Sequence, residues 1–186
     1  MIKDPRIARL EPWRCATCDE LHDGLLDLGA DRPASCDEAL PIEENSALRL
    51  TGDFLSKDFC VLGGEDFFVR AVLELELQNR DETFAYGVWS TLSQPNFERY
   101  VEGFDGDEQS QDGPWFGWFS TALKGYPDTE NLKCRVHPQD GQERPLIELE
   151  PTEHPLSQEQ QHGIDLDRLF EIYAINGHPQ QGDETP

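Results

Sequence analysis

FFVRAVLELELQ, residues 67 to 78, decides the fold class, because its apolar and charged side chains alternate. An alternation of period two is typical of a β-strand with one buried face. FAYGVWSTLS, residues 84 to 93, follows a short polar connector, and its β-branched and aromatic residues predict an antiparallel partner strand. The first strand carries its apolar residues on one face and its charged residues on the other: Val69, Ala71, Leu73, Leu75 and Leu77 against Arg70, Glu74 and Glu76.

Further strands and helices follow this hairpin. Strands are predicted at residues 115–123, 130–138 and 145–150. Helices are predicted at 95–104, 156–163 and 165–177, with Ser93 and Asp165 as caps of the first and the last. We therefore expect an α+β fold, an antiparallel sheet of about five or six strands with helices on one side.

The chain of 186 residues divides into three parts that belong to one folding unit. Residues 1–45 are rich in proline, glycine and aspartate and predict an irregular N-terminal segment. Residues 46–176 form the α+β body. Residues 177–186 lack apolar anchors and predict a loose tail.

The charge of the chain is strongly negative. Lys and Arg number 15 and Asp and Glu number 38, so the formal net charge is −23. Such a charge repels phosphate backbones and anionic lipids, which makes nucleic acid and membranes poor partners. It attracts basic proteins and speeds their association, so a basic protein partner is expected.

The same sequence predicts a cytoplasmic protein. The charged N-terminus lacks the apolar run of a secretory signal, and no stretch of about 18 apolar residues could span a membrane. Five cysteines without such a signal do not indicate a secreted disulfide framework.

WRCATCDELHDGL, residues 13 to 25, predicts a metal site. Cys15 and Cys18 form a Cys-x-x-Cys turn that presents two sulfurs, and His22 lies four residues further on. A closed tetrahedral zinc site needs a fourth ligand. Cys60 is the preferred candidate, because it would tie the irregular segment to the sheet, and Cys36 is the second choice.

Two other interpretations of this stretch remain open. Cys15 and Cys18 could be a redox pair or simple reduced thiols, although the preceding EPWR is too short for the buried strand of a thioredoxin-like motif. Three ligands alone would instead leave a coordination position open for water, as in a zinc enzyme.

Four stretches of the chain resemble the bacterial family called domain of unknown function 2199. They are the Cys-x-x-Cys with His22, SKDFCVLGGEDFFVRAVLELEL, YGVWSTLSQPNFERY, and RPLIELEPTEHPLSQEQQHGIDLDRLFEI. The resemblance runs from about Cys15 to about Ile175 and implies a bacterial cytoplasmic domain without naming an activity. It also implies that cysteines matching Cys15, Cys18 and Cys60 and a histidine matching His22 recur in the family.

An acidic and aromatic stretch is the candidate interaction surface. WFGWF, residues 115 to 119, predicts a strand with one face in the core, and the loop before it has acidic residues but no Lys or Arg. A solvated loop that only aids solubility is the alternative. The candidate residues are Glu102, Asp105, Asp107, Glu108, Asp112, Trp115 and Trp118.

Two classes of function follow. The first is a non-enzymatic protein-binding domain with a structural zinc ion, whose sharpest form is an immunity or antitoxin protein for a basic toxin. The second is a zinc-dependent enzyme of unknown reaction. No catalytic residue is assigned, because His137, His154 and His162 have no recognisable catalytic companion in the sequence.

Overall fold

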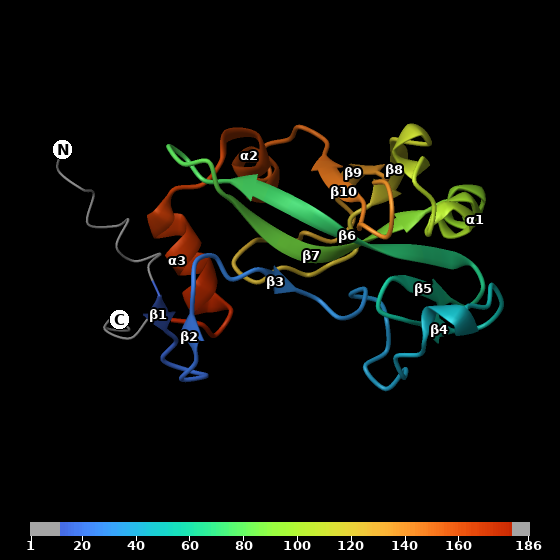
Figure 1. Ribbon diagram of the computed structural model, residues 1–186, viewed down its shortest axis with the longest axis horizontal. Helices are drawn as coiled ribbons and strands as arrows, with labels where there is room; N and C mark the ends of the chain where they lie inside the picture. Colours follow the sequence, from blue (N-terminus) through green and yellow to red (C-terminus); the bar gives the residue numbers. More distant parts are fainter. Residues whose placement is uncertain (1–11, 180–186) are drawn as a thin grey trace.

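The computed structural model of the chain describes residues 12–179 and shows an α+β fold (Figure 1). In these residues a mixed sheet of eight strands stands beside a sheet of two strands, β1 (Trp13–Arg14) and β2 (Leu21–His22). The helices are α1 (Gln94–Gly103), α2 (Pro155–His162) and α3 (Leu166–Ile175). The strands of the larger sheet are β3 (Leu28–Gly29), β4 (Phe54–Leu55), β5 (Phe59–Leu62), β6 (Asp66–Glu76), β7 (Thr83–Leu92), β8 (Trp115–Trp118), β9 (Lys133–His137) and β10 (Leu146–Leu149).

The hairpin of β6 and β7 forms the centre of the large sheet and confirms the alternation read from the sequence. The two strands are antiparallel and pair from Phe67 opposite Leu92 to Glu76 opposite Thr83. The residues of β6 that were predicted to face inward are fully buried: Val69, Ala71, Leu73 and Leu75. This hairpin therefore supplies the apolar face of the main core, while Phe68 of β6 and Trp89 of β7 belong to a second, smaller apolar cluster.

The sheet is mixed and larger than predicted. Its order is β3-β7-β6-β10-β9-β8, with β5 on the edge of β6 and β4 beyond it. β10 runs parallel to β6, and β3 runs parallel to β7, so the expectation of a wholly antiparallel sheet of five or six strands is wrong. Strand direction depends on how the connections cross the sheet, and strands of two residues are too short to produce a recognisable period.

The helices pack against the main core. Buried side chains of all three helices belong to the same core as the inward residues of β6. Asp165 caps α3 by accepting a hydrogen bond from the N–H of Arg168 at 2.8 Å, as predicted. Ser93 occupies the cap position of α1, although its side chain makes no capping hydrogen bond.

β8 lies close against β7 at Gly117. Ser90 and Phe119 form an isolated bridge, and the N–H of Trp118 donates to Oγ1 of Thr91 at 2.9 Å. A Cβ on Gly117 would lie 2.5 Å from the carbonyl oxygen of Thr91. Glycine therefore allows the two backbones to approach. No helix within residues 12–179 is long and apolar enough to cross a membrane.

Candidate metal centre

The N-terminal hairpin presents the first three donor atoms. β1 and β2 pair through Trp13 opposite His22, and the connecting turn closes when the N–H of Cys15 donates to the carbonyl oxygen of Glu20 at 3.0 Å. Within this turn the N–H of Thr17 points at the Cys15 sulfur, 3.4 Å away. The hairpin thereby places the side chains of Cys15, Cys18 and His22 beside one another, as the spacing predicts.

The fourth donor comes from the other end of the chain. After α3 ends, the N–H of His178 donates to the carbonyl oxygen of Tyr173 at 2.8 Å, which turns the chain toward the hairpin. The N–H of Ala16 then donates to the carbonyl oxygen of Pro179 at 2.9 Å. Trp13 stacks on Tyr173 with ring centroids 5.7 Å apart. These contacts hold the end of α3 against the hairpin.

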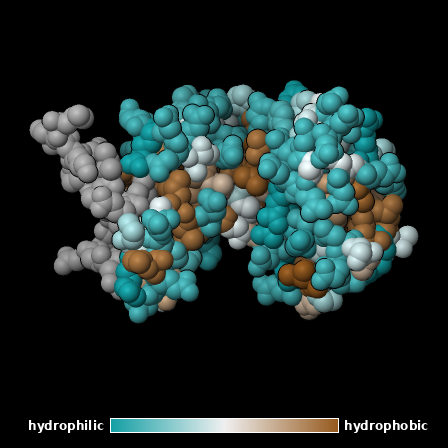
Figure 2. Space-filling view, viewed as in Figure 1, coloured by the Kyte–Doolittle hydropathy of each residue, from teal (hydrophilic) through white to brown (hydrophobic). Residues whose placement is uncertain are grey.

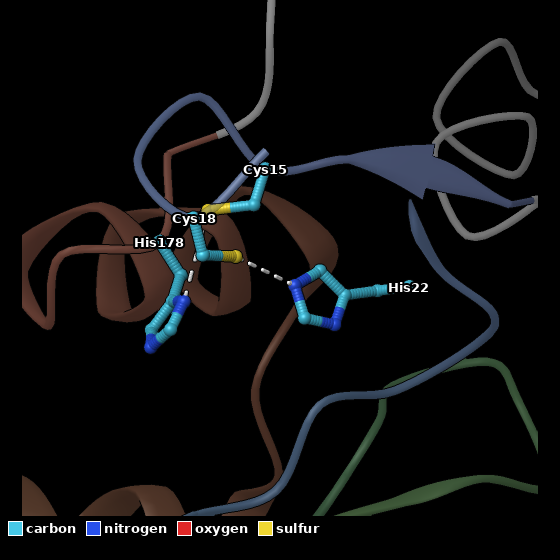
Figure 3. Close-up of side chains that lie close together, drawn as sticks. All are labelled: Cys15, Cys18, His22 and His178. Carbon is cyan, nitrogen blue, oxygen red and sulfur yellow. Dashed lines mark hydrogen bonds between the residues drawn. The ribbon is translucent and has the colours of Figure 1, made fainter. Parts of the chain in front are cut away.

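Four donor atoms converge between these two segments (Figure 3). One atom from each of Cys15, Cys18, His22 and His178 lies within 4.8 Å of every other. Sγ of Cys18 is 3.5 Å from Nε2 of His22, and Sγ of Cys15 is 3.7 Å from Nδ1 of His178. Cys15 is fully buried, Cys18 is exposed, and the two histidines are half-buried. The cluster could therefore hold one metal ion.

The two thiols of the cluster differ in acidity. Burial opposes ionisation of Cys15, but the N–H groups of Cys18 and Thr17 stabilise its thiolate and leave its pKa below the ordinary value. The N–H of Glu20 favours the thiolate of Cys18, yet desolvation and the neighbouring Cys15 outweigh it and raise the pKa of Cys18. Cys15 is therefore the more acidic of the two thiols, and a cation between the sulfurs would favour the thiolate form of both.

The structure does not bring Cys60 or Cys36 to this cluster. Cys60 lies on β5, fully buried in a second apolar cluster with Cys36, Leu55 and Phe68. Burial is the main cause that raises the pKa of both thiols. Contact with Cys60 partly lowers the pKa of Cys36, whereas Cys36 raises the pKa of Cys60 further. In the described structure the fourth member of the Cys/His cluster is His178, and the knuckle is joined to the end of α3 instead of to the sheet.

Sequence reasoning missed His178 because it assigned residues 177–186 to a loose tail. Residues 177–179 of that segment are described and make the contacts given above, while 180–186 lie outside the described residues. The only signal in the sequence was a histidine soon after the last helix. This signal is too weak to identify a ligand 163 positions away from Cys15.

The remaining histidines have ordinary structural contacts. His154 caps α2, where its Nδ1 accepts from the N–H of Leu156 at 3.1 Å. His137 lies 2.8 Å from the exposed carboxylate of Glu148 on the neighbouring strand. Nδ1 of His162 lies 2.8 Å from the carbonyl oxygen of Gln158, one helical turn earlier.

The predicted interaction residues divide into exposed and buried groups. Glu102, Asp105, Asp107 and Glu108 are exposed at the end of α1 and in the loop after it. Trp118 is 39% exposed, whereas Trp115 is buried in the core. Asp112 forms an ion pair with Arg99, and Asp105 accepts from Nε2 of Gln142 at 2.6 Å. Of the two predicted tryptophans, Trp115 therefore contributes to packing, and Trp118 lies at the surface.

Comparison with known proteins finds one family. No curated protein and no solved structure matches the chain. The family model described as "Uncharacterized protein conserved in bacteria (DUF2199)" matches residues 14–164. The match includes Cys15, Cys18, His22 and the strands of the large sheet, and it ends before α3 and His178. The chain belongs to this bacterial family of uncharacterised proteins, DUF2199.

Proposed function

We propose that Cys15, Cys18, His22 and His178 hold a structural zinc ion. Tetrahedral zinc, with Zn–S bonds of about 2.3 Å and Zn–N bonds of about 2.0 to 2.1 Å, separates neighbouring ligand atoms by about 3.3 to 3.8 Å. The distances of 3.5 Å and 3.7 Å fall in this range, and all four donor atoms lie within 4.8 Å of one another, which supports this assignment. A set of two thiolates and two imidazoles also binds zinc in preference to hard cations such as Mg²⁺ and Ca²⁺.

The zinc ion would act as a cross-link. It would join the N-terminal hairpin to the segment after α3, two parts of the chain that otherwise meet through Trp13, Tyr173 and a few backbone hydrogen bonds. Four protein donors fill a tetrahedral shell and leave no position for a substrate or water. The convergence of four donor atoms is the observation that carries the structural role.

We further propose that the protein is a non-enzymatic binding domain for a basic protein. The formal net charge of −23 supports this, because a field of this sign raises the local concentration of cationic partners. Figure 2 shows one face of the molecule, on which hydrophilic residues dominate and the apolar ones form separate patches. An immunity or antitoxin protein that neutralises a basic toxin is the sharpest form of this proposal.

A zinc-dependent enzyme is the competing function, and it needs one of the four donors to be absent from the metal. Cobalt substitution separates the two, because Co²⁺ in a closed Cys₂His₂ shell keeps its absorption spectrum when azide or thiocyanate is added. A spectrum that shifts with these anions would favour an open, catalytic metal.

Metal analysis of purified variants tests the ligand assignment. We expect one zinc ion per chain in the wild type and in Cys60→Ser, and loss of zinc in His178→Ala. His162→Ala is the matched control, because it also removes a histidine near the C-terminal end of a helix without touching the cluster. Zinc lost from Cys60→Ser and kept in His178→Ala would show that the assignment is wrong.

A binding experiment with cationic proteins tests the proposal that the chain binds a basic protein. The purified protein should retain proteins of high isoelectric point from a bacterial lysate, and increasing salt should release them, since screening weakens a charge-driven encounter. A retained set no more basic than the lysate as a whole would count against the proposal.

A further inference from the structure

Two neighbouring aromatic side chains point outward from β8. Phe116 is 50% exposed and Trp118 is 39% exposed. Their rings meet edge to face, with centroids 5.2 Å apart at an angle of 85°. Aromatic side chains that remain in water next to each other are typical anchors of protein interfaces.

The fold does not require aromatic residues at these two positions. Trp115 and Gly117 face inward on β8, where Trp115 packs against Tyr100 and Gly117 lies against β7. Alternation then forces positions 116 and 118 outward, and any strand-forming polar residue could occupy them. The apolar character of Phe116 and Trp118 therefore serves something other than the core.

The pair borders a pocket of about 390 Å³ whose rim is negatively charged. Asp66, the first residue of β6, and Glu65 just before it are both exposed and line the pocket together with Phe116 and Trp118. The residues that line it include no Lys or Arg. We call this set, Glu65, Asp66, Phe116 and Trp118, the aromatic pocket. It combines an apolar wall with two carboxylates.

The beginning of α1 also borders the aromatic pocket through Ser93 and Asn96. A helix N-terminus carries about half a positive charge. Two carboxylates outweigh this contribution, and the formal net charge of −23 adds to the negative potential. The pocket therefore favours a cation.

We infer that the aromatic pocket docks an arginine side chain of the basic partner protein, an inference that rests on the proposed function. A guanidinium group is planar, stacks on aromatic faces, and directs N–H donors toward carboxylates at its edge. Trp118 and Phe116 supply the aromatic surface, and Glu65 and Asp66 supply the acceptors. A second copy of this chain would bring a second acidic rim against the first, and nucleic acid would bring phosphates, so both are disfavoured by charge.

A pair of peptides tests this inference directly. The probe is acetyl-Ala-Arg-Ala-amide, and its control is the same peptide with citrulline, which has the shape of arginine without the charge. Binding is followed by NMR through the indole N–H signal of Trp118, assigned with Trp118→Phe. We expect the arginine peptide to shift this signal more than the indole signals of Trp13 and Trp89, and the citrulline peptide to shift it little.

Variants separate a specific pocket from diffuse charge. Glu65→Gln/Asp66→Asn and Phe116→Ser should each weaken arginine-peptide binding by about two- to fivefold. Glu130→Gln/Glu153→Gln removes two exposed carboxylates elsewhere, and it should change the affinity by less than about twofold. All four substituted carboxylates and Phe116 are exposed, and thermal melts would verify that each variant folds.

Three results would overturn the inference. Equal shifts by arginine and citrulline peptides would show that charge plays no part. Equal weakening of arginine-peptide binding in the pocket and control variants would show only diffuse electrostatic attraction. The inference about the pocket would then be wrong, while the proposed binding of basic proteins would be unaffected. Self-association that is abolished by Phe116→Ser/Trp118→Ser would assign the aromatic pair to a second copy of the chain. If basic proteins are also not retained from the lysate, the proposed function fails as well.

Discussion

Nδ1 of His178 lies 3.7 Å from Sγ of Cys15, although 163 positions separate the two residues in the chain. The contact joins the first described hairpin to the segment that follows the last helix. A metal ion shared by these residues would close a loop that contains nearly the whole domain. Cross-links over long loops remove the most conformational entropy from the unfolded chain.

Removal of zinc should destabilise the protein measurably. With free zinc about 1,000-fold above its dissociation constant, binding contributes about 4 kcal/mol to the free energy of unfolding. In a domain of this size that corresponds to a fall in Tm of about 8 to 16 °C on chelation. Thermal melts with and without EDTA measure it.

Two variants control this chelation experiment. His178→Ala should melt as the chelated wild type does and should show no further response to EDTA. Cys60→Ser should keep the full response, because Cys60 lies in a separate cluster. An EDTA response that His178→Ala preserves would contradict the cross-link.

Tyr173→Phe should weaken the attachment of the N-terminal segment to α3. The N–H of Leu26 donates to the Tyr173 hydroxyl oxygen at 2.8 Å, and removal of that oxygen leaves a half-buried donor without this acceptor. We expect the free energy of unfolding to fall by about 1 to 3 kcal/mol, measured by urea denaturation. Tyr100→Phe is the matched control, since its buried hydroxyl has no partner within residues 12–179, and it should be neutral or stabilising.

Gly117→Ala should destabilise the contact between β8 and β7. The added methyl group would meet Oγ of Ser90 and lie 2.5 Å from the carbonyl oxygen of Thr91, and the latter is backbone that cannot rotate away. Overpacking of this kind costs about 1 to 3 kcal/mol, measurable by urea denaturation. Gly87→Ala on β7 is the control, because its methyl group would lie 3.5 Å from its nearest neighbour. Equal stability of the two variants would refute the close approach.

Stability should fall at alkaline pH through Cys134. Burial raises the pKa of this thiol from 9.0 to about 11, partly offset by the Ser90 hydroxyl 3.3 Å away. Because the folded pKa lies above the unfolded value, the contribution is complete below about pH 9 and is lost as pH rises toward 11. The free energy of unfolding should therefore decrease by up to about 1.4 kcal/mol per pH unit in this window.

Cys134→Ala isolates this effect from other titrating groups. The variant should show a shallower decline between pH 9 and pH 11, because the other buried thiols and the tyrosines titrate alike in both proteins and only the contribution of Cys134 is removed. Urea denaturation at several pH values gives the two slopes. Parallel slopes for the variant and the wild type would mean that the folded protein does not hold Cys134 in its neutral form.

The central strand and the helix cap could be predicted from the sequence because they depend on residues close together in the chain. The alternation from Val69 to Leu77 is visible in the sequence, since each side chain of a half-buried strand must face either the core or water. Asp165 was identifiable as a helix cap for a similar reason, because a cap acts within three residues. These interactions need no knowledge of distant parts of the chain.

The candidate site shows where local reasoning ends. The turn around Cys15 and Cys18 and the position of His22 follow from spacing, so three donors were predicted correctly as neighbours. Cys60 was preferred as the fourth because it lies on a strand, yet β5 directs it into a separate apolar cluster. Sequence spacing contains no information about which distant residue meets a given turn.

The sequence by itself therefore determined the central hairpin, the helices and the Cys-x-x-Cys knuckle, because each depends on contacts among residues close together in the chain. Only the tertiary structure decided that β3 and β10 run parallel to their neighbours and that His178 completes the Cys/His cluster. Both outcomes depend on the path of long connections, in which packing of the whole core selects one arrangement from many that local preferences allow.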